Sequence, residues 1–379
     1  MVKMHDEYSM MTRAAPTLIE IDLAALRHNY LELKKRLGTG TKTLAVVKSN
    51  AYGHGAVPVA RTLQALGADL FGVGTVDEGV QLREAGIKRP ILILLGLIDG
   101  KFPELVRYNL TPIVYDLGRA AELNKFLEGR AERLDIHIKV DTGMTRLGVA
   151  VQEAARFFDE LKEMKGLVPR GLATHLADAD DKPFSNRQVV NFEKARMEFQ
   201  SRFPSAQYHV ASSLASIDRR FPYDACRLGI ALYGAYPVKR QSRLVSLQPV
   251  MHWKTRLIAI RKVPKGTAVS YGRTYQTQRE SRIGVVPVGY ADGYLRLLSN
   301  RAFVLVRGVR VPVAGTICMD MFMIDVSKIA GVKVGDEVVL IGSQGRETIT
   351  AEELGKWGET ISYELFCRIA ERIPRHTLG

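Results

Sequence analysis

The sequence predicts an α/β protein in which an N-terminal (β/α)8 barrel precedes a smaller, mainly β domain. Strand-like and helix-like segments alternate eight times, over roughly 240 residues, and this pattern and length are typical of a closed parallel barrel. Beyond residue 243 the strand-like segments become short and closely spaced. A chain of 379 residues is also longer than one hydrophobic core usually supports. We therefore expect a barrel over residues 1–243 and a mainly β domain over residues 244–379.

The elements of the barrel are expected from apolar runs and their spacing. A strand over residues 18–23 leads into a helix that ends at Gly38 and Gly40. The eight barrel strands are predicted at residues 44–47, 70–73, 91–95, 111–115, 134–140, 168–176, 208–211 and 227–233. The helices between them are predicted at residues 58–66, 76–85, 101–108, 117–127, 151–164 and 187–203.

Turn signals separate the strands of the second domain. These strands are expected at residues 255–263, 282–288, 302–307, 309–314 and 336–342. One late helix is expected to begin with a capping box, in which Thr350 is the N-cap and Glu353 lies three residues on.

Composition and charge exclude several classes of protein. The hydrophobic content of 46% and the charged content of 25% are those of an ordinary soluble globular protein. The net charge of +14 is scattered, and no zinc-finger spacing or RNP motif accompanies it, so no nucleic-acid partner is expected. The three cysteines lie far apart and indicate neither a zinc site nor disulfides. Without a signal-peptide core or an apolar run of membrane-spanning length, a cytoplasmic protein with no membrane partner is expected.

Polar side chains follow the predicted barrel strands at the edge where barrel active sites lie. Lys48 directly follows the first strand, and burial there would lower the pKa of its ammonium and free a nucleophilic amine. The other strand ends carry Lys139, Asp141, Arg146, His175, Ser212, Ser213 and Arg227. An amine, a histidine, further cations and a glycine-serine edge suit an anionic ligand such as a phosphate.

Other chemistries have less support. Residues 72–74 lack the third glycine of a dinucleotide fingerprint, no P-loop occurs, and the histidines show no metal-binding spacing. Ser212 and Ser213 lie outside any Gly-x-Ser-x-Gly elbow. Neither metal catalysis nor serine hydrolysis is therefore expected.

Seven segments, in order along almost the whole chain, resemble the alanine racemase family. They are residues 45–55 (AVVKSNAYGHG), 139–148 (KVDTGMTRLG), 227–234 (RLGIALYG), 270–272 (SYG), 289–293 (GYADG), 317–320 (ICMD) and 361–364 (ISYE). The resemblance implies a pyridoxal-phosphate enzyme with a (β/α)8 barrel and a C-terminal β domain. It also implies a homodimer whose active sites are shared between the subunits.

The resemblance assigns roles in catalysis. Lys48 would hold the cofactor as a Schiff base, and Tyr271, reaching in from the partner subunit, would be the base on the opposite face of the substrate's α-carbon. His175 would favour the phenolate of Tyr271. Arg227, supported by His209, would meet the pyridine nitrogen and keep it largely unprotonated, because arginine does not give up its proton. An unprotonated ring would limit transamination.

Further roles concern the cofactor's phosphate, the substrate and the entrance. The phosphate would be bound by Tyr52, Ser213, Tyr363 and the backbone around Gly229 and Ile230. The substrate carboxylate would meet Arg146 and the backbone at Met319. Lys139 matches a position that is carbamylated in many members, although an ordinary lysine paired with Asp141 is the alternative. Tyr290 and Tyr363 would narrow the entrance and favour a small side chain.

The implied function is that of an alanine racemase, an isomerase that interconverts L- and D-alanine by a two-base mechanism on a pyridoxal phosphate aldimine and supplies D-alanine for peptidoglycan. Ser49 and Ser212 replace the family's usual alanine and asparagine, which leaves substrate preference and turnover open. The alternatives are an amino-acid racemase of broader specificity that accepts serine, and a non-catalytic pyridoxal-phosphate carrier. A carrier is a lone barrel, whereas a related barrel decarboxylase would need no second base.

Overall fold

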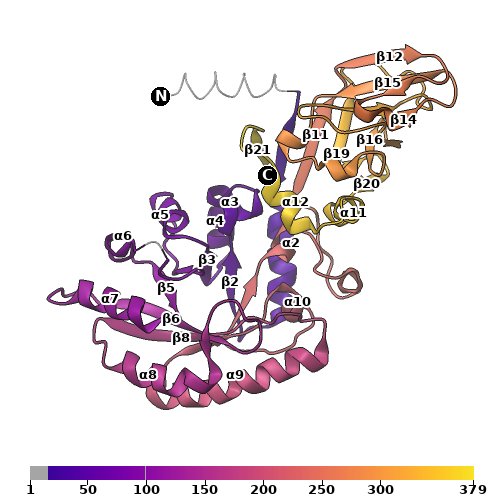
Figure 1. Cartoon of the computed structure of the whole chain (residues 1–379). Coiled ribbons are helices and arrows are strands. Elements are labelled where there is room, and N and C mark those ends of the chain that lie inside the picture. Colours follow the sequence, from indigo (N-terminus) through magenta and orange to yellow (C-terminus); the bar gives the residue numbers. More distant parts are fainter. Residues whose placement is uncertain (1–15, 99) are drawn as a thin grey trace. The chain divides into compact units, whose positions relative to one another are not determined.

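The computed structural model describes residues 16–98 and 100–379 (Figure 1). The chain forms two compact units. One comprises residues 27–247, and the other combines residues 248–379 with the described residues up to Leu26. Residues 1–15, where the sequence analysis finds no signal-peptide core, lie outside the described residues.

The unit of residues 27–247 is built on parallel strands. They are β2 (Lys42–Val46), β3 (Leu70–Val73), β4 (Ile91–Ile93), β5 (Thr111–Val114), β6 (Leu134–Asp141), β8 (Leu167–Ala173), β9 (Gln207–His209) and β10 (Ala225–Leu228). They pair in the order β10-β2-β3-β4-β5-β6-β8-β9, with the short β7 (Val149–Ala150) beside β6. Every residue of β3, β4 and β5 is buried, as in strands covered on both faces. The predicted (β/α)8 barrel is confirmed.

The barrel is nearly closed, and its seam lies between β9 and β10. In the described chain these two strands share no regular ladder. The backbone N–H of Arg227 donates to the carbonyl of Ala211 at 2.9 Å, and the N–H of Tyr208 donates to the carboxylate of Asp224 at 2.7 Å. The Arg227 side chain adds bonds to the carbonyls of His209 and Val210. Arg227 therefore helps to join the two edges of the sheet.

Helices connect the strands and cover the outside of this sheet. They are α2 (Leu23–Leu37), α4 (Ala56–Ala65), α5 (Val76–Glu84), α6 (Phe102–Arg107), α7 (Leu117–Leu127), α8 (Ala154–Lys162), α9 (Lys182–Arg202) and α10 (Ser213–Ile217). The segment labelled α3 (Lys48–Tyr52) is a turn of left-handed residues directly after β2. In α8, Phe157, Phe158 and Leu161 are buried at the spacing of one helix face. The ring of Phe158 meets Phe199 of α9 edge-on at 4.9 Å, where the two helices lie side by side (Figure 1).

The second unit is mainly β, and segments far apart in the sequence share its largest sheet. Its strands are β1 (Leu18–Asp22), β11 (Met251–Arg256), β16 (Phe303–Val306), β17 (Val309–Pro312), β19 (Glu337–Gln344), β20 (Glu347–Ile349) and β21 (Arg375–Leu378). β1 pairs antiparallel with β11 and parallel with β21. A smaller sheet contains β12 (Ala259–Val263), β15 (Ser281–Val286) and β18 (Phe322–Asp325), and a hairpin joins β13 (Ala268–Val269) to β14 (Tyr275–Gln276). In the core, the ring of Tyr294 stacks on Phe322 at 4.8 Å.

Two local predictions for this unit are wrong. The strand expected over residues 255–263 is divided between β11 and β12, because the N–H of Leu257 bonds to Asp336 and the N–H of Ile258 bonds to Val285 of the other sheet. The one late helix expected is two helices, α11 (Ala351–Trp357) and α12 (Ser362–Arg368).

The N-cap of α11 is as predicted, but the capping box is incomplete. The Thr350 hydroxyl accepts a hydrogen bond from the N–H of Glu353 at 3.2 Å. The carboxylate of Glu353 accepts bonds from Arg310 instead of turning back to the N-cap. Throughout residues 16–98 and 100–379, no helix combines the length and the apolar character needed to cross a membrane.

Candidate active site

The structure brings the predicted polar residues of the barrel together at the carboxyl ends of its strands. Lys48 follows β2, Lys139 lies near the end of β6, His175 follows β8 and Arg227 lies on β10. Burial, followed by the charges of Arg146, Arg227 and Lys48, lowers the pKa of Lys139 to about 8. The cations therefore lie close enough to repel one another, and the rim attracts an anion.

The backbone directly after Lys48 is left-handed. Ser49, Asn50, Ala51 and Tyr52 have φ between 51° and 55°. This conformation costs an L-residue about 1–2 kcal/mol, so four in succession require strong support from the surrounding structure. Neither the apolar run before Lys48 nor the polar residues after it predicts such a turn.

Two side chains that the sequence analysis did not select hold this turn. The Glu78 carboxylate accepts hydrogen bonds from the N–H groups of Ser49 and Gly74, both at 2.6 Å. The buried His54 ring contacts the carbonyls of Ala51 and Tyr52 through Nδ1, at 3.0 and 2.9 Å. Because a carbonyl only accepts, Nδ1 of His54 carries the proton.

Arg227 is held by acceptors on several strand ends. Its Nη1 donates to the backbone carbonyl of His209 and to Nδ1 of the His209 ring, both at 2.8 Å. Its Nη2 donates to the carbonyls of Thr174 and Val210 at 2.7 Å and to Nδ1 of His175 at 3.1 Å. Its Nε–H has no partner in the described chain. Burial lowers the pKa of Arg227 to about 10, so the guanidinium stays protonated at neutral pH.

His175 is a neutral imidazole whose tautomer follows from its contact with Arg227. Burial, followed by the charge of Arg227, lowers its pKa well below the usual value. Arg227 can only donate, so Nδ1 of His175 accepts and its proton lies on Nε2. His175 thus offers an N–H donor from Nε2.

Hydroxyl groups gather around Gly229. The Ser213 hydroxyl accepts hydrogen bonds from the N–H groups of Gly229 at 2.9 Å and Ala231 at 3.5 Å. A Cβ on Gly229 would lie 2.8 Å from the Tyr52 hydroxyl, so only glycine permits this close approach. Ile230 begins the short helical turn that follows. The arrangement suits a phosphate, whose oxygens accept hydrogen bonds from hydroxyl and backbone groups.

Arg146 lies on a loop that Asp141 shapes. The Asp141 carboxylate accepts hydrogen bonds from the N–H groups of Gly143 and Met144 at 2.9 Å. Although burial opposes the charge, these bonds lower the pKa of Asp141. The Arg146 side chain is exposed beyond this turn. No hydrogen bond or ion pair joins Lys139 to Asp141 among the described residues, although the charge of Asp141 raises the pKa of Lys139.

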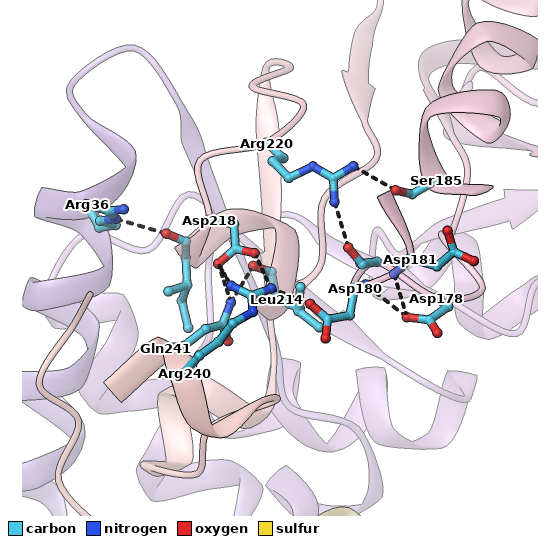
Figure 2. A network of polar contacts seen from close by, with 12 residues as sticks. Arg36, Asp178, Asp180, Asp181, Ser185, Leu214, Asp218, Arg220, Arg240 and Gln241 are labelled. Atoms are coloured by element: carbon cyan, nitrogen blue, oxygen red, sulfur yellow. Dashed lines mark hydrogen bonds and ion pairs between the residues drawn. The ribbon is translucent and has the colours of Figure 1, made fainter. Parts of the chain in front are cut away.

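A polar network supports the loop that carries His175 (Figure 2). Arg240 binds Asp180 on this loop and Asp218 at the end of α10. Arg220 donates to the Ser185 hydroxyl at 2.7 Å and to the carbonyl of Ala179 at 2.7 Å. The network therefore connects the segment after β8 with the helix that Ser213 begins.

The β unit gathers a second group of predicted residues. Tyr271, Tyr290 and Met319 lie on three adjacent segments, with exposed fractions of 72%, 43% and 54%. The carbonyl of Tyr271 accepts a bond from the Thr316 hydroxyl at 2.9 Å, and the N–H of Tyr290 donates to the carbonyl of Cys318 at 3.1 Å. Each of these side chains is exposed to a degree common on protein surfaces, but their position on adjacent segments groups them into one patch, and such patches are typical of binding surfaces.

Arg372 ties two of these segments together, although sequence reasoning did not find it. Its guanidinium donates to Asp292 at 2.8 Å and to Asp320 at 2.9 Å. Asp292 follows Tyr290 by two residues, and Asp320 follows Met319. Tyr363 lies on α12, where burial raises its pKa to about 12, so it stays a neutral hydroxyl.

The nearly closed barrel with its cationic rim and the separate, mainly β unit define a two-domain barrel protein. The family descriptions "Alanine racemase, N-terminal domain" and "Alanine racemase, C-terminal domain" match residues 21–237 and 250–377. The chain therefore belongs to the alanine racemase family.

Individual relatives agree with this assignment. An alanine racemase of Halothermothrix orenii is 43% identical over 364 residues, which cover 95% of this chain and 96% of the relative. The crystal structure of alanine racemase from the D-cycloserine producer Streptomyces lavendulae has a TM-score of 0.92 and 33% identity, over 96% of this chain and 97% of that one. The alanine racemase of Clostridium difficile 630 has a TM-score of 0.90 and 35% identity, over 96% of both chains.

Proposed function

We propose that this protein is an alanine racemase that uses pyridoxal phosphate, bound through Lys48, to interconvert L- and D-alanine. Besides the family, one observation carries the proposal. Arg227 is fixed as a protonated donor on the rim that carries Lys48, with its Nε–H still available to a ligand. The pyridine nitrogen of the cofactor, placed against this guanidinium, must accept a hydrogen bond and stay unprotonated, because arginine only donates.

The residues present fit the cofactor. Within the barrel unit, the hydroxyls of Tyr52 and Ser213 and the backbone at Gly229 and Ile230 suit its phosphate, and Arg227 suits the ring nitrogen. The family resemblance adds the hydroxyl of Tyr363 as a further phosphate ligand. When bound, pyridoxal phosphate supplies the conjugated imine and ring that take up the electron pair of the α-carbon. Every other requirement of racemisation falls to side chains and backbone groups of the protein.

Two of these side chains move the proton. The Lys48 amine would take or return it on one face of the α-carbon and the Tyr271 hydroxyl on the other, because a single base tends to return a proton to the face it came from. A phenol is a weak base at neutral pH. The Nε2–H of neutral His175 would donate to its oxygen and so favour the phenolate.

Other residues would position the substrate. Arg146 and the backbone N–H of Met319 would bind its carboxylate, and Tyr290 and Tyr363 would limit the size of its side chain. The lowered pKa of Lys139 favours carbamylation, because only the neutral amine attacks carbon dioxide. A carbamate at Lys139 would give Arg146 an anionic partner.

The proposal includes a homodimer in the cytoplasm that supplies D-alanine for peptidoglycan, with Tyr271 and Met319 reaching the partner's barrel. Mixing the inactive variants Lys48→Ala and Tyr271→Phe tests the shared sites. In hybrid dimers one site regains both residues, so after subunit exchange about a quarter of wild-type activity is expected. If exchange is demonstrated and no activity returns, each site belongs to one chain.

Assays of racemisation test the function itself. The purified protein, supplied with pyridoxal phosphate, should convert L-alanine to D-alanine and the reverse, and Lys48→Ala should abolish both. Conversion of serine at a comparable rate would favour a racemase of broader specificity, since an apolar pocket rejects one added hydroxyl only weakly. Cofactor binding without conversion of any amino acid would favour a carrier.

A further inference from the structure

Two buried histidines extend from Arg227 into the barrel. Nη1 of Arg227 lies 2.8 Å from Nδ1 of His209, and Nε2 of His209 lies 2.9 Å from Nδ1 of His137. His137 is 4% exposed and His209 is 1% exposed. Arg227 lies on β10, His209 on β9 and His137 on β6. Together they form a continuous chain of hydrogen bonds that starts at Arg227 and runs into the barrel.

The direction of every hydrogen bond in this chain follows from the arginine. Because Arg227 only donates, Nδ1 of His209 accepts, and a neutral His209 must carry its proton on Nε2. That N–H donates to Nδ1 of His137, whose own proton is therefore on Nε2. Burial lowers the pKa of His137 to about 4, and burial followed by the charge of Arg227 lowers that of His209 well below its usual value. Both rings are neutral at physiological pH.

The strand between the two histidines carries a glycine where the rings need space. Gly171 on β8 is paired in register with His137. A Cβ at Gly171 would lie 2.4 Å from Nδ1 of His137, far below a van der Waals contact. The absent side chain allows the imidazole of β6 to reach across β8 to β9.

We infer that His137 is a positioning residue for the reaction, which holds Arg227 against the cofactor by fixing the tautomer of His209. This inference rests on the proposed function. Without an acceptor at residue 137, the buried Nε2–H of His209 loses its partner, and a buried unpaired donor is costly. Moving the proton to Nδ1 relieves that cost but places an N–H against the N–H of Arg227. The guanidinium would then no longer be fixed at the ring nitrogen.

Two substitutions separate this role from packing. His137→Leu keeps a side chain of similar size and removes the acceptor, whereas the Oδ1 of His137→Asn can occupy the position of Nδ1 and accept. Ile138→Val is the matched control, because Ile138 is buried on the same strand and its side chain alternates to the other face. The holoenzymes are compared in kcat and KM for alanine and in the release of pyridoxamine phosphate per racemisation event.

In His137→Leu we expect the transamination ratio, which is the release of pyridoxamine phosphate per racemisation event, to rise about tenfold, because one buried hydrogen bond is lost. The change in KM should be smaller. His137→Asn and Ile138→Val should stay near the wild-type ratio. An unchanged ratio in folded His137→Leu would overturn the inference. So would an equal rise in His137→Asn, since packing alone would then explain it.

A second readout is independent of activity. In protein labelled with ¹⁵N in its histidine rings and free of cofactor, NMR should show His209 protonated at Nε2, with Nδ1 unprotonated. His137→Leu should alter this pattern, and His137→Asn should preserve it. A protein that shows this pattern but does not racemise would contradict the proposed function alone. A wild-type His209 protonated at Nδ1 would contradict the inference alone.

Discussion

The carboxylate of Glu78 accepts a hydrogen bond from the backbone N–H of Ser49 at 2.6 Å. The same carboxylate accepts a hydrogen bond from the N–H of Gly74, which directly follows β3, and it completes a capping box with Thr75 at the start of α5. One side chain thus connects a strand end, a helix start and the left-handed turn that follows Lys48. The strained turn is supported by a neighbouring strand-helix unit.

Substituting Glu78→Gln should therefore weaken the turn. An amide has one acceptor oxygen, and its NH₂ group would face a backbone donor, so we expect a loss of stability of about 1–3 kcal/mol. The fraction of protein that binds the cofactor at Lys48, read from its visible absorbance, should also fall. Urea unfolding measures the loss of stability, and a cofactor titration measures the loss of binding. Glu84→Gln, which changes an exposed carboxylate bonded to Tyr108, is the control. Equal behaviour of the two variants would contradict the role of Glu78.

Gly229→Ala should weaken cofactor binding. The new methyl group would lie 2.8 Å from the Tyr52 hydroxyl and displace it from the proposed phosphate position. We expect the Kd for pyridoxal phosphate to rise about tenfold, which corresponds to ~1.4 kcal/mol. Equilibrium dialysis measures this change. Gly40→Ala is the control, because its methyl group would meet no neighbouring atom. An unchanged Kd would place the phosphate elsewhere.

Lys139 should be carbamylated in a way that depends on pH. With a pKa of about 8, lowered by burial and then by Arg146, the neutral amine makes up about one tenth of Lys139 at pH 7 and half at pH 8. Protonation blocks attack on carbon dioxide, so at constant dissolved carbon dioxide the carbamate should increase from pH 7 to pH 9.

The measurement is ¹³C NMR with labelled carbon dioxide, and Lys139→Gln should remove the signal. Lys254, which is paired with Glu20, is a control residue whose substitution should leave the signal unchanged. The absence of any carbamate signal from the wild-type protein would favour an ordinary lysine at this position.

The barrel was predictable because its strands are buried on both faces and read as apolar runs. The strand at Leu70–Val73 and the helix at Leu117–Leu127 have the predicted bounds. The Thr-x-x-Glu spacing of Thr75 and Glu78 was a signal for a capping box that sequence reasoning did not use. It predicts the helix start but not the bond from Glu78 to Ser49.

Other features depend on contacts that no local pattern reveals. The pairing of β1 with β11 joins residues more than two hundred positions apart, and His137 and His209 meet across 72 positions. The left-handed turn was not predictable, because residues 49–52 contain no glycine and owe their conformation to Glu78 and His54. The strand end at Lys48 could be read from sequence, whereas its supporting contacts could not.

Lys48 and Tyr271 are proposed to exchange a proton with opposite faces of the α-carbon of alanine. Incubation of the holoenzyme with L-alanine and, separately, D-alanine in deuterated water, followed by measurement of enantiomer composition and α-deuterium, tests this exchange. We predict inversion in both directions with deuterium in the inverted product, and in Tyr271→Phe a loss of inversion from L-alanine and from D-alanine. Exchange of the α-hydrogen without inversion, or no exchange in the cofactor-bound protein, would show that Lys48 and Tyr271 do not act as a pair of bases.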